Sequence, residues 1–125
     1  MSAQALERTR TAIAKASESW GERGEARIAT GLSFGDGEEV EILVRKRGRR
    51  YDLSDEGSAV RKAGVAGSSW LEVAERVVAD EGMNVNRKGV VFVPAVEGRD
   101  LASLTVRLAE TALAVYDELL GLELV

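Results

Sequence analysis

Residues 40–57, VEILVRKRGRRYDLSDEG, set the architecture of the chain. Aliphatic residues stand at every second position in the first part of this segment, which is the period of a strand with one buried face. A turn is predicted at Gly48, and the alternation resumes after it. The residues that define the two strands are Val40, Ile42 and Val44 before the turn, and Tyr51 and Leu53 after it.

The residues that precede this segment extend the same pattern. Alternation also holds over residues 25–34, and Gly35-Asp36-Gly37 then predicts a tight turn, because Asp-Gly tolerates the positive φ that hairpin turns need. Residues 25–53 are therefore predicted to form a three-stranded antiparallel meander.

Apolar residues have helical spacing in the segments before and after this meander, and a pair of short strands is predicted between two of the later helices. We predict an α+β fold with an antiparallel sheet, a three-stranded meander plus a hairpin, packed with helices in the order α-βββ-αα-ββ-α. We expect one domain over residues 1–125, with an N-terminal helix within 1–22 and the remaining elements within 25–122. The predicted helices are 2–20, about 59–63, a helix that starts at Trp70 with Ser69 as its cap, and 99–122; the hairpin strands are 83–86 and 90–93.

Two local signals refine these boundaries. Ser69 and Glu72 have the spacing of a capping box at the start of a helix. Pro94, the only proline, is expected to close the last strand, where its missing N–H costs little.

The C-terminal helix, residues 99–122, carries two adjacent apolar rows, a stripe wider than one sheet face normally covers. Two alternatives follow. The helix can be a central core helix held by the sheet and the N-terminal helix, or it can bury part of its width in a homo-oligomer. The two rows are Leu101, Leu104, Leu108, Ala112, Val115, Leu119 and Leu122, and Val106, Ala109, Leu113, Tyr116 and Leu120.

The composition excludes several chemistries. The 125 residues include 45% hydrophobic and 30% charged residues, which is typical of a folded domain. There is no Cys and no His, so Ser-His-Asp triads, thiolate nucleophiles and His-ligated metal centres cannot form in this chain. No apolar run approaches the length of a membrane span, and we expect no secretory signal and a cytoplasmic location.

The first candidate site is a run of five cations in six residues at the predicted hairpin tip. The net charge is −4, so the rest of the chain carries −9. Such a tip can contact nucleic-acid phosphates. It can also be a solvated turn, neutralised by acidic residues on the adjoining turn and strand, which are Asp36, Glu38, Glu39 and Glu41. The sequence pI of about 5.0 is unlike that of a dedicated DNA-binding domain. The candidate binding residues are Arg45, Lys46, Arg47, Arg49, Arg50 and Tyr51.

The second candidate is a group of carboxylates, Asp52, Asp55 and Glu56, where a strand leads into a helix. Carboxylates gathered at a turn can hold Mg²⁺ and position a phosphate. The same residues are also ordinary at a helix start, where carboxylates are favoured by the helix dipole. No other cofactor is indicated.

Aromatic residues are few: 5% of the chain, which is too few for the stacking platform of a single-strand-binding protein. Trp20, Phe34, Trp70 and Phe92 are predicted to lie in the core, because each falls on an apolar face.

One segment carries a resemblance to a known family. Tyr51-Asp52-Leu53-Ser54-Asp55-Glu56-Gly57 resembles the aromatic-x-Leu-Thr-Asp-Asp-Gly motif of the bacterial and phage domain of unknown function numbered eighteen-twenty-eight. The resemblance extends from Arg27 to about Leu119, with Ser54 and Glu56 in place of Thr and the second Asp. It implies a small cytoplasmic protein of a prophage or mobile element and directs attention to Tyr51, Leu53, Asp55 and Gly57, but it implies no reaction.

These observations favour an interaction domain that is not an enzyme, with a protein or nucleic acid as its partner. The alternative is a metal-assisted phosphodiesterase or nucleotide-processing enzyme that uses Asp52, Asp55 and Glu56.

Overall fold

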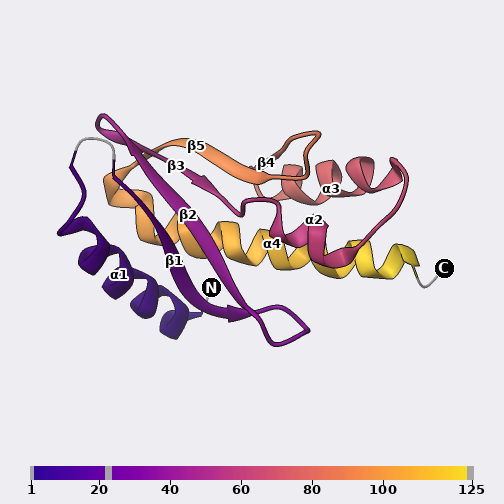
Figure 1. The fold of residues 1–125 in the computed structure, drawn as a ribbon, viewed down its shortest axis with the longest axis horizontal. Coiled ribbons are helices and arrows are strands. Elements are labelled where there is room, and N and C mark those ends of the chain that lie inside the picture. The colour runs from indigo at the N-terminus through magenta and orange to yellow at the C-terminus, as the bar shows by residue number, and fades with distance from the viewer. Residues whose placement is uncertain (1, 22–23, 124–125) are drawn as a thin grey trace.

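One long helix, α4, packs across a five-stranded antiparallel sheet with the strand order β1-β2-β3-β5-β4 (Figure 1). The computed structural model describes residues 2–21 and 24–123. The order of elements is the predicted one, and the α+β class is confirmed. The elements are α1 (Ala3–Ser17), β1 (Glu25–Ser33), β2 (Glu39–Arg47), β3 (Arg50–Ser54), α2 (Ser58–Ala63), α3 (Ser69–Asp80), β4 (Asn84–Val85), β5 (Val91–Glu97), a 3-10 turn (Gly98–Asp100) and α4 (Leu101–Glu123).

The wide apolar stripe of α4 is covered within the chain. The sheet lies on one side of α4, and α1, α2 and α3 pack around it, so both apolar rows find neighbours (Figure 1). This is the first of the two arrangements considered for this helix. Leu122, with 38% of its surface exposed, is the exposed large apolar residue near its end. A homo-oligomer through residues 99–122 stays a prediction.

The sheet has two unlike faces, because side chains alternate between them along every strand. The inner face, toward α4, carries Ile28, Val40, Ile42, Val44 and Leu53, all buried. The outer face has no helix packed on it in the described part of the chain, as Figure 1 shows with α4 passing behind the strands. Of the candidate residues, Arg45, Arg47 and Asp52 lie on this outer face.

The start of the chain is a shorter helix than predicted. Helix α1 begins after Ser2, whose hydroxyl accepts a hydrogen bond from the Ala5 N–H, and it ends at Ser17 rather than near residue 20. Trp20 lies beyond the helix and packs against Tyr51, with ring centroids 5.7 Å apart. The aromatic ring therefore joins the chain after α1 to the sheet.

Two local predictions were wrong. Ser69 is the first residue of α3 and not its cap; the cap position is Ser68, and no side-chain capping bond is formed there. Pro94 does not end the last strand, since β5 continues to Glu97 past a bulge at which Pro94 and Ala95 together oppose Asp52. Within the bulge no ladder hydrogen bond is needed from the Pro94 nitrogen, so the strand can continue past the proline.

No helix in the described ranges, 2–21 and 24–123, combines the length and apolar character that a bilayer-spanning segment requires.

Candidate functional site on the outer face of the sheet

The basic run does not form one continuous patch, because alternation divides it between the two faces. Arg45 and Arg47 lie on the outer face with Asp52, while Lys46 pairs with Tyr51 on the inner side, next to Trp20. Tyr51, the aromatic candidate of the run, is half-buried and packs on Trp20, on the face opposite Arg45 and Arg47.

Most arginines of the run are engaged in surface ion pairs. Arg45 Nε lies 2.9 Å from a Glu25 carboxylate oxygen, and Arg50 Nη1 lies 2.9 Å from a Glu97 oxygen. Arg47 holds Asp52 through two bonds of 2.9 and 3.0 Å. The neutralisation considered from the sequence therefore occurs, but through other carboxylates than those on residues 36–41.

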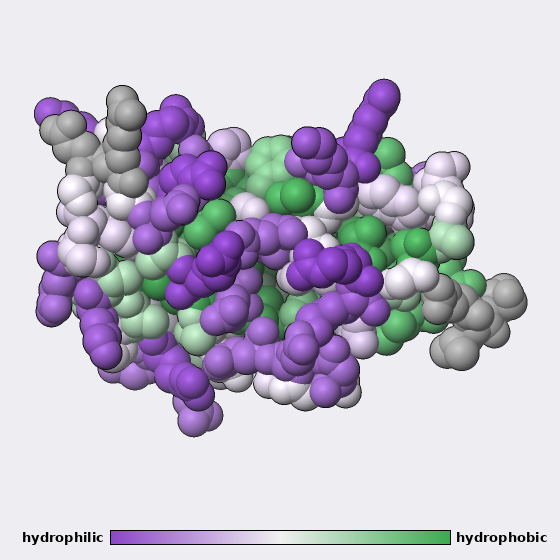
Figure 2. Space-filling view, viewed as in Figure 1, coloured by the Kyte–Doolittle hydropathy of each residue, from purple (hydrophilic) through white to green (hydrophobic). Residues whose placement is uncertain are grey.

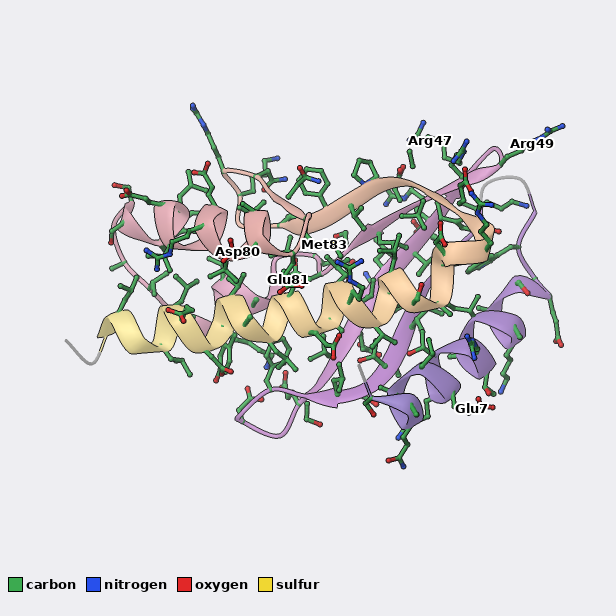
Figure 3. The ribbon with its side chains drawn as sticks, turned by 180° about the vertical axis from the view of Figure 1, so that it is seen from behind. Glu7, Arg47, Arg49, Asp80, Glu81 and Met83 are labelled. Carbon is green, nitrogen blue, oxygen red and sulfur yellow. The ribbon has the colours of Figure 1, made fainter. Side chains whose placement is uncertain are left out.

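The acidic residues before the second strand have partners of their own. Arg8 pairs with Glu39, and Lys62 of α2 pairs with Asp36 and Glu38. Lys46 and Arg49 form no ion pair with a described residue. Figure 3 shows Arg49 at the outer end of the β2–β3 hairpin. The cationic surface open to a polyanion is thus much smaller than the sequence suggests.

Asp52 supports the β5 bulge. Its Oδ1 accepts the N–H of Ala95 at 3.0 Å, a backbone donor that the bulge leaves out of the ladder. Ala95 has a φ of 57°, the left-handed region that only a constrained non-glycine residue adopts. The hydrogen bonds from Arg47, together with that of Ala95, hold the pKa of Asp52 below its ordinary value of 3.8. Asp52 is therefore ionised and bound at neutral pH.

Asp55 ties three elements together through backbone bonds. Its carboxylate accepts N–H groups from Gly57 at 2.8 Å, Val91 at 2.9 Å and Ala59 at 3.2 Å, and only 1% of the residue is exposed. Its own N–H donates to the Val91 carbonyl at 2.9 Å, so the side chain completes the strand ladder with β5. Burial raises the pKa of Asp55 above 3.8, and the three backbone donors oppose that rise.

Glu56 faces another way. Arg27 of β1 binds it with two bonds of 2.7 and 2.8 Å, and this pairing lowers the pKa of Glu56. The three predicted ligands thus have separate partners: Arg47, the backbone around Val91, and Arg27. Within the described residues the structure brings no three Asp, Glu, His or Cys side chains together in a way that could hold a metal ion.

The family-like motif has a structural explanation in these contacts. Leu53 is a core residue with 1% exposure, and Asp55 is the buried carboxylate, here called the clip, whose hydrogen bonds join β3, α2 and β5. Gly57 has a φ of 81°, which suits glycine at the turn where its N–H points back to Asp55. The motif thus matches a strand, turn and helix junction.

Sequence reasoning missed a hollow on the outer face near Phe92. Predicted as core, Phe92 instead pairs with Ser54 on the outer face and is half-buried without joining the core cluster. The hollow has a volume of about 350 Å³. It is lined by Phe92, Val90, Val93, Pro94, Leu53, Ser54, Asn86 and the pair Arg47–Asp52.

A row of side chains crosses this face from one edge to the other. The register aligns Arg27, Leu43, Ser54, Phe92 and Asn84 on successive strands. Two apolar side chains, Leu43 and Phe92, therefore flank the small Ser54. Figure 2 shows green side chains over β4 and β5 and purple ones over the β1–β2 hairpin and α2. The signal was present in the sequence: Phe92 alternates with Val91 and Val93, so it had to face away from them.

The chain matches no family model, no curated protein and no solved structure. The resemblance to the domain numbered eighteen-twenty-eight stays a prediction.

Proposed function

We propose that this chain is a protein-binding domain and that the outer face of its sheet receives the partner. The observation that carries the proposal is the hollow of about 350 Å³ beside Phe92, on a sheet face that no helix of residues 2–21 and 24–123 covers. Leu43, Val90 and Phe92 are partly exposed apolar side chains outside the core cluster. An apolar centre in a charged surround is the usual composition of a protein interface.

The surrounding charges support a protein partner over nucleic acid. The pairs Arg27–Glu56, Arg45–Glu25 and Arg47–Asp52 form a rim of alternating sign. Nucleic-acid binding needs uncompensated cations that can release counterions from phosphates. A rim of paired charges instead suits recognition by complementary charges on a protein surface.

The metal-assisted reaction has no observation in its favour, because Asp52, Asp55 and Glu56 are each bound elsewhere. A cytoplasmic location and a bacterial or phage source stay predictions from the sequence.

Site-specific photo-crosslinking in the native cell tests the proposal. A photoreactive phenylalanine analogue replaces Phe92, and a matched variant carries it at Glu75, an exposed position of α3. We expect a discrete protein adduct from position 92 that is absent from position 75. Leu43→Asp on the same face should abolish the adduct, because it replaces one of the two apolar side chains of this row by a charge.

Two outcomes would contradict the proposal. The first is a lack of protein adducts at position 92, or equal adducts at both positions. The second is retention of a 20-nucleotide DNA or RNA at low salt that is lost when Arg45, Lys46, Arg47, Arg49 and Arg50 are replaced by Gln, which would make nucleic acid the partner.

A further inference from the structure

Strand β1 forms one edge of the sheet, and among the described residues β2 is its only neighbouring strand. Its hydrogen bonds to β2 can be assigned, because the Lys46 N–H donates to the Gly24 carbonyl and antiparallel pairs alternate along the ladder. Ala26 and Ile28 therefore bond to β2. The peptide groups of Glu25, Arg27 and Ala29 face away from it, toward the edge.

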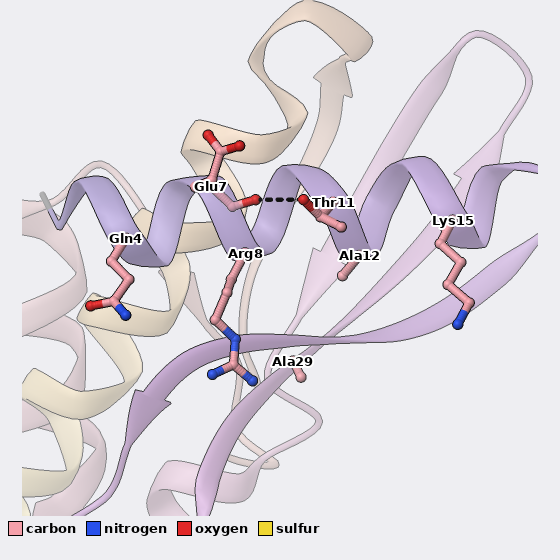
Figure 4. A pocket seen from close by; sticks show the side chains of 7 residues that line it. All are labelled: Gln4, Glu7, Arg8, Thr11, Ala12, Lys15 and Ala29. Atoms are coloured by element: carbon pink, nitrogen blue, oxygen red, sulfur yellow. Dashed lines mark hydrogen bonds between the residues drawn. The ribbon is translucent and has the colours of Figure 1, made fainter.

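Helix α1 runs beside this edge in the opposite direction. A Cβ at Gly31 would meet Arg8 at 3.1 Å, and a Cβ at Gly24 would meet Trp20, so the start of the helix lies by the end of the strand. A groove of about 440 Å³ separates the two. Its walls are Ala29 on β1 and Gln4, Glu7, Arg8, Thr11, Ala12 and Lys15 on α1 (Figure 4).

The side chains of the groove leave room along its middle. Ala12 and Ala29 contribute only methyl groups to the lining, and the Thr11 hydroxyl donates to the Glu7 carbonyl of its own helix (Figure 4). The centre of the groove is therefore apolar and lies next to Ala29, whose peptide group faces the edge. An extended segment can add to an exposed strand edge through main-chain hydrogen bonds and place alternate side chains in such a space.

The charges define the segment further. Arg8 is held by Glu39, which also accepts the Gly31 N–H at 2.9 Å, so this cation is compensated and fixed. Figure 4 shows Lys15 pointing toward β1 and Glu7 pointing away from it. Of the two cations that line the groove, Lys15 is the one that forms no ion pair with a described residue. An acidic side chain would complement it.

We propose that the groove between α1 and the outer edge of β1 binds an extended peptide segment as an added strand, with an apolar side chain between Ala12 and Ala29 and an acidic side chain against Lys15. This site lies apart from the Phe92 hollow, so it does not depend on the function proposed above.

Titration of the ¹⁵N-labelled protein with the capped peptide Thr-Val-Thr-Val-Glu-Val tests the proposal. We expect the largest amide shifts at Arg27 and Ala29, and slower hydrogen exchange at both. Lys15→Glu should weaken binding roughly tenfold, because an attraction becomes a repulsion. Arg10→Glu, at an exposed position of α1 that does not line the groove, is the matched control and should leave the affinity unchanged.

A second pair of probes separates strand addition from simple charge attraction. The same peptide with N-methylated alternate residues cannot form the main-chain bonds and should not bind. A peptide with Lys in place of Glu should prefer the Lys15→Glu protein. Phe92→Ser should have no effect, which distinguishes this site from the outer face.

Three results would overturn the proposal: no binding at millimolar peptide, equal binding of the N-methylated peptide, or amide shifts centred on Phe92. Amide shifts at Arg27 and Ala29 that depend on protein concentration without peptide, with sedimentation as a dimer, would show that a second copy occupies the edge and would also overturn it.

Discussion

Both ends of strand β3 are rich in charged residues, basic at the hairpin end and acidic at the other, and the two ends differ in how these residues are bound. At the hairpin end, Arg47 and Arg50 pair with carboxylates in solvent. At the other end, Asp55 is buried and binds only backbone N–H groups. An exposed pair can be remade with water, but a buried carboxylate and its donors cannot. Charge density therefore says little about a residue's role until its burial is known.

Removal of the Asp55 carboxylate is the strongest test of the difference between the buried end and the exposed end of β3. Asp55→Ala leaves the N–H groups of Gly57, Ala59 and Val91 without their acceptor, and we expect it to lower the free energy of unfolding by about 3–5 kcal/mol. Urea denaturation followed by circular dichroism measures it. A loss no greater than that caused by Glu56→Ala would show that the clip is not important.

A substitution at each of two turn glycines would show how much packing against a turn adds to backbone strain. Gly89 has a φ of 83°, and a Cβ there would lie 3.0 Å from Val60; Gly48 has a φ of 64° with nothing within 4 Å. Gly89→Ala should cost about 2–3 kcal/mol and Gly48→Ala about 1 kcal/mol, because only the first adds crowding to backbone strain. The same denaturation experiment measures both, and equal losses would contradict the difference in packing.

The pH dependence of stability should also distinguish the buried carboxylate Asp55 from the exposed carboxylates Asp52 and Glu56. The pKa of Asp55 is raised, so the folded state binds its proton first, and this group adds stability as the pH falls through that pKa toward 3.8. The pKa values of Asp52 and Glu56 are lowered, and their contribution, full above the unfolded values, is lost as the pH falls toward their folded values.

Asp55→Asn removes only the first of these contributions. The free energy of unfolding should then fall more steeply with decreasing pH than in the native protein, within the window between 3.8 and the raised pKa of Asp55. Denaturation at a series of pH values measures the slopes, and carboxyl ¹³C titration assigns the groups. Identical slopes would show that Asp55 titrates as it does in an unfolded chain.

The smallest effect is expected at the hairpin. Replacement of Arg45, Arg47 and Arg50 by Gln should change the melting temperature less than Gly48→Ala does, because these ion pairs are exposed. The difference from the native protein should vanish at high salt. A large loss that persists in high salt would mean that the arginines act through packing.

The strands and helices were predictable where their apolar spacing is regular. Val40, Ile42 and Val44 are buried on one face as alternation requires, and α4 follows its two apolar rows. The predictions failed where an end or an irregularity depends on distant residues. Pro94 continues its strand because Asp52 supports the Ala95 N–H across the sheet, and nothing near Pro94 in the sequence indicates it.

The candidate site shows the same division. The local sequence indicated that charges gather on residues 45–56, and the motif directed attention to Gly57, which has a φ of 81°. It could not show that Glu97 would neutralise Arg50, 47 residues away, or that Val91 would engage Asp55. Periodicity and turn chemistry act between neighbours in the chain and are fixed by composition and order. Which strand lies at an edge, and which carboxylate meets which donor, depends on how distant segments pack, and that is settled only when the whole sheet closes on α4.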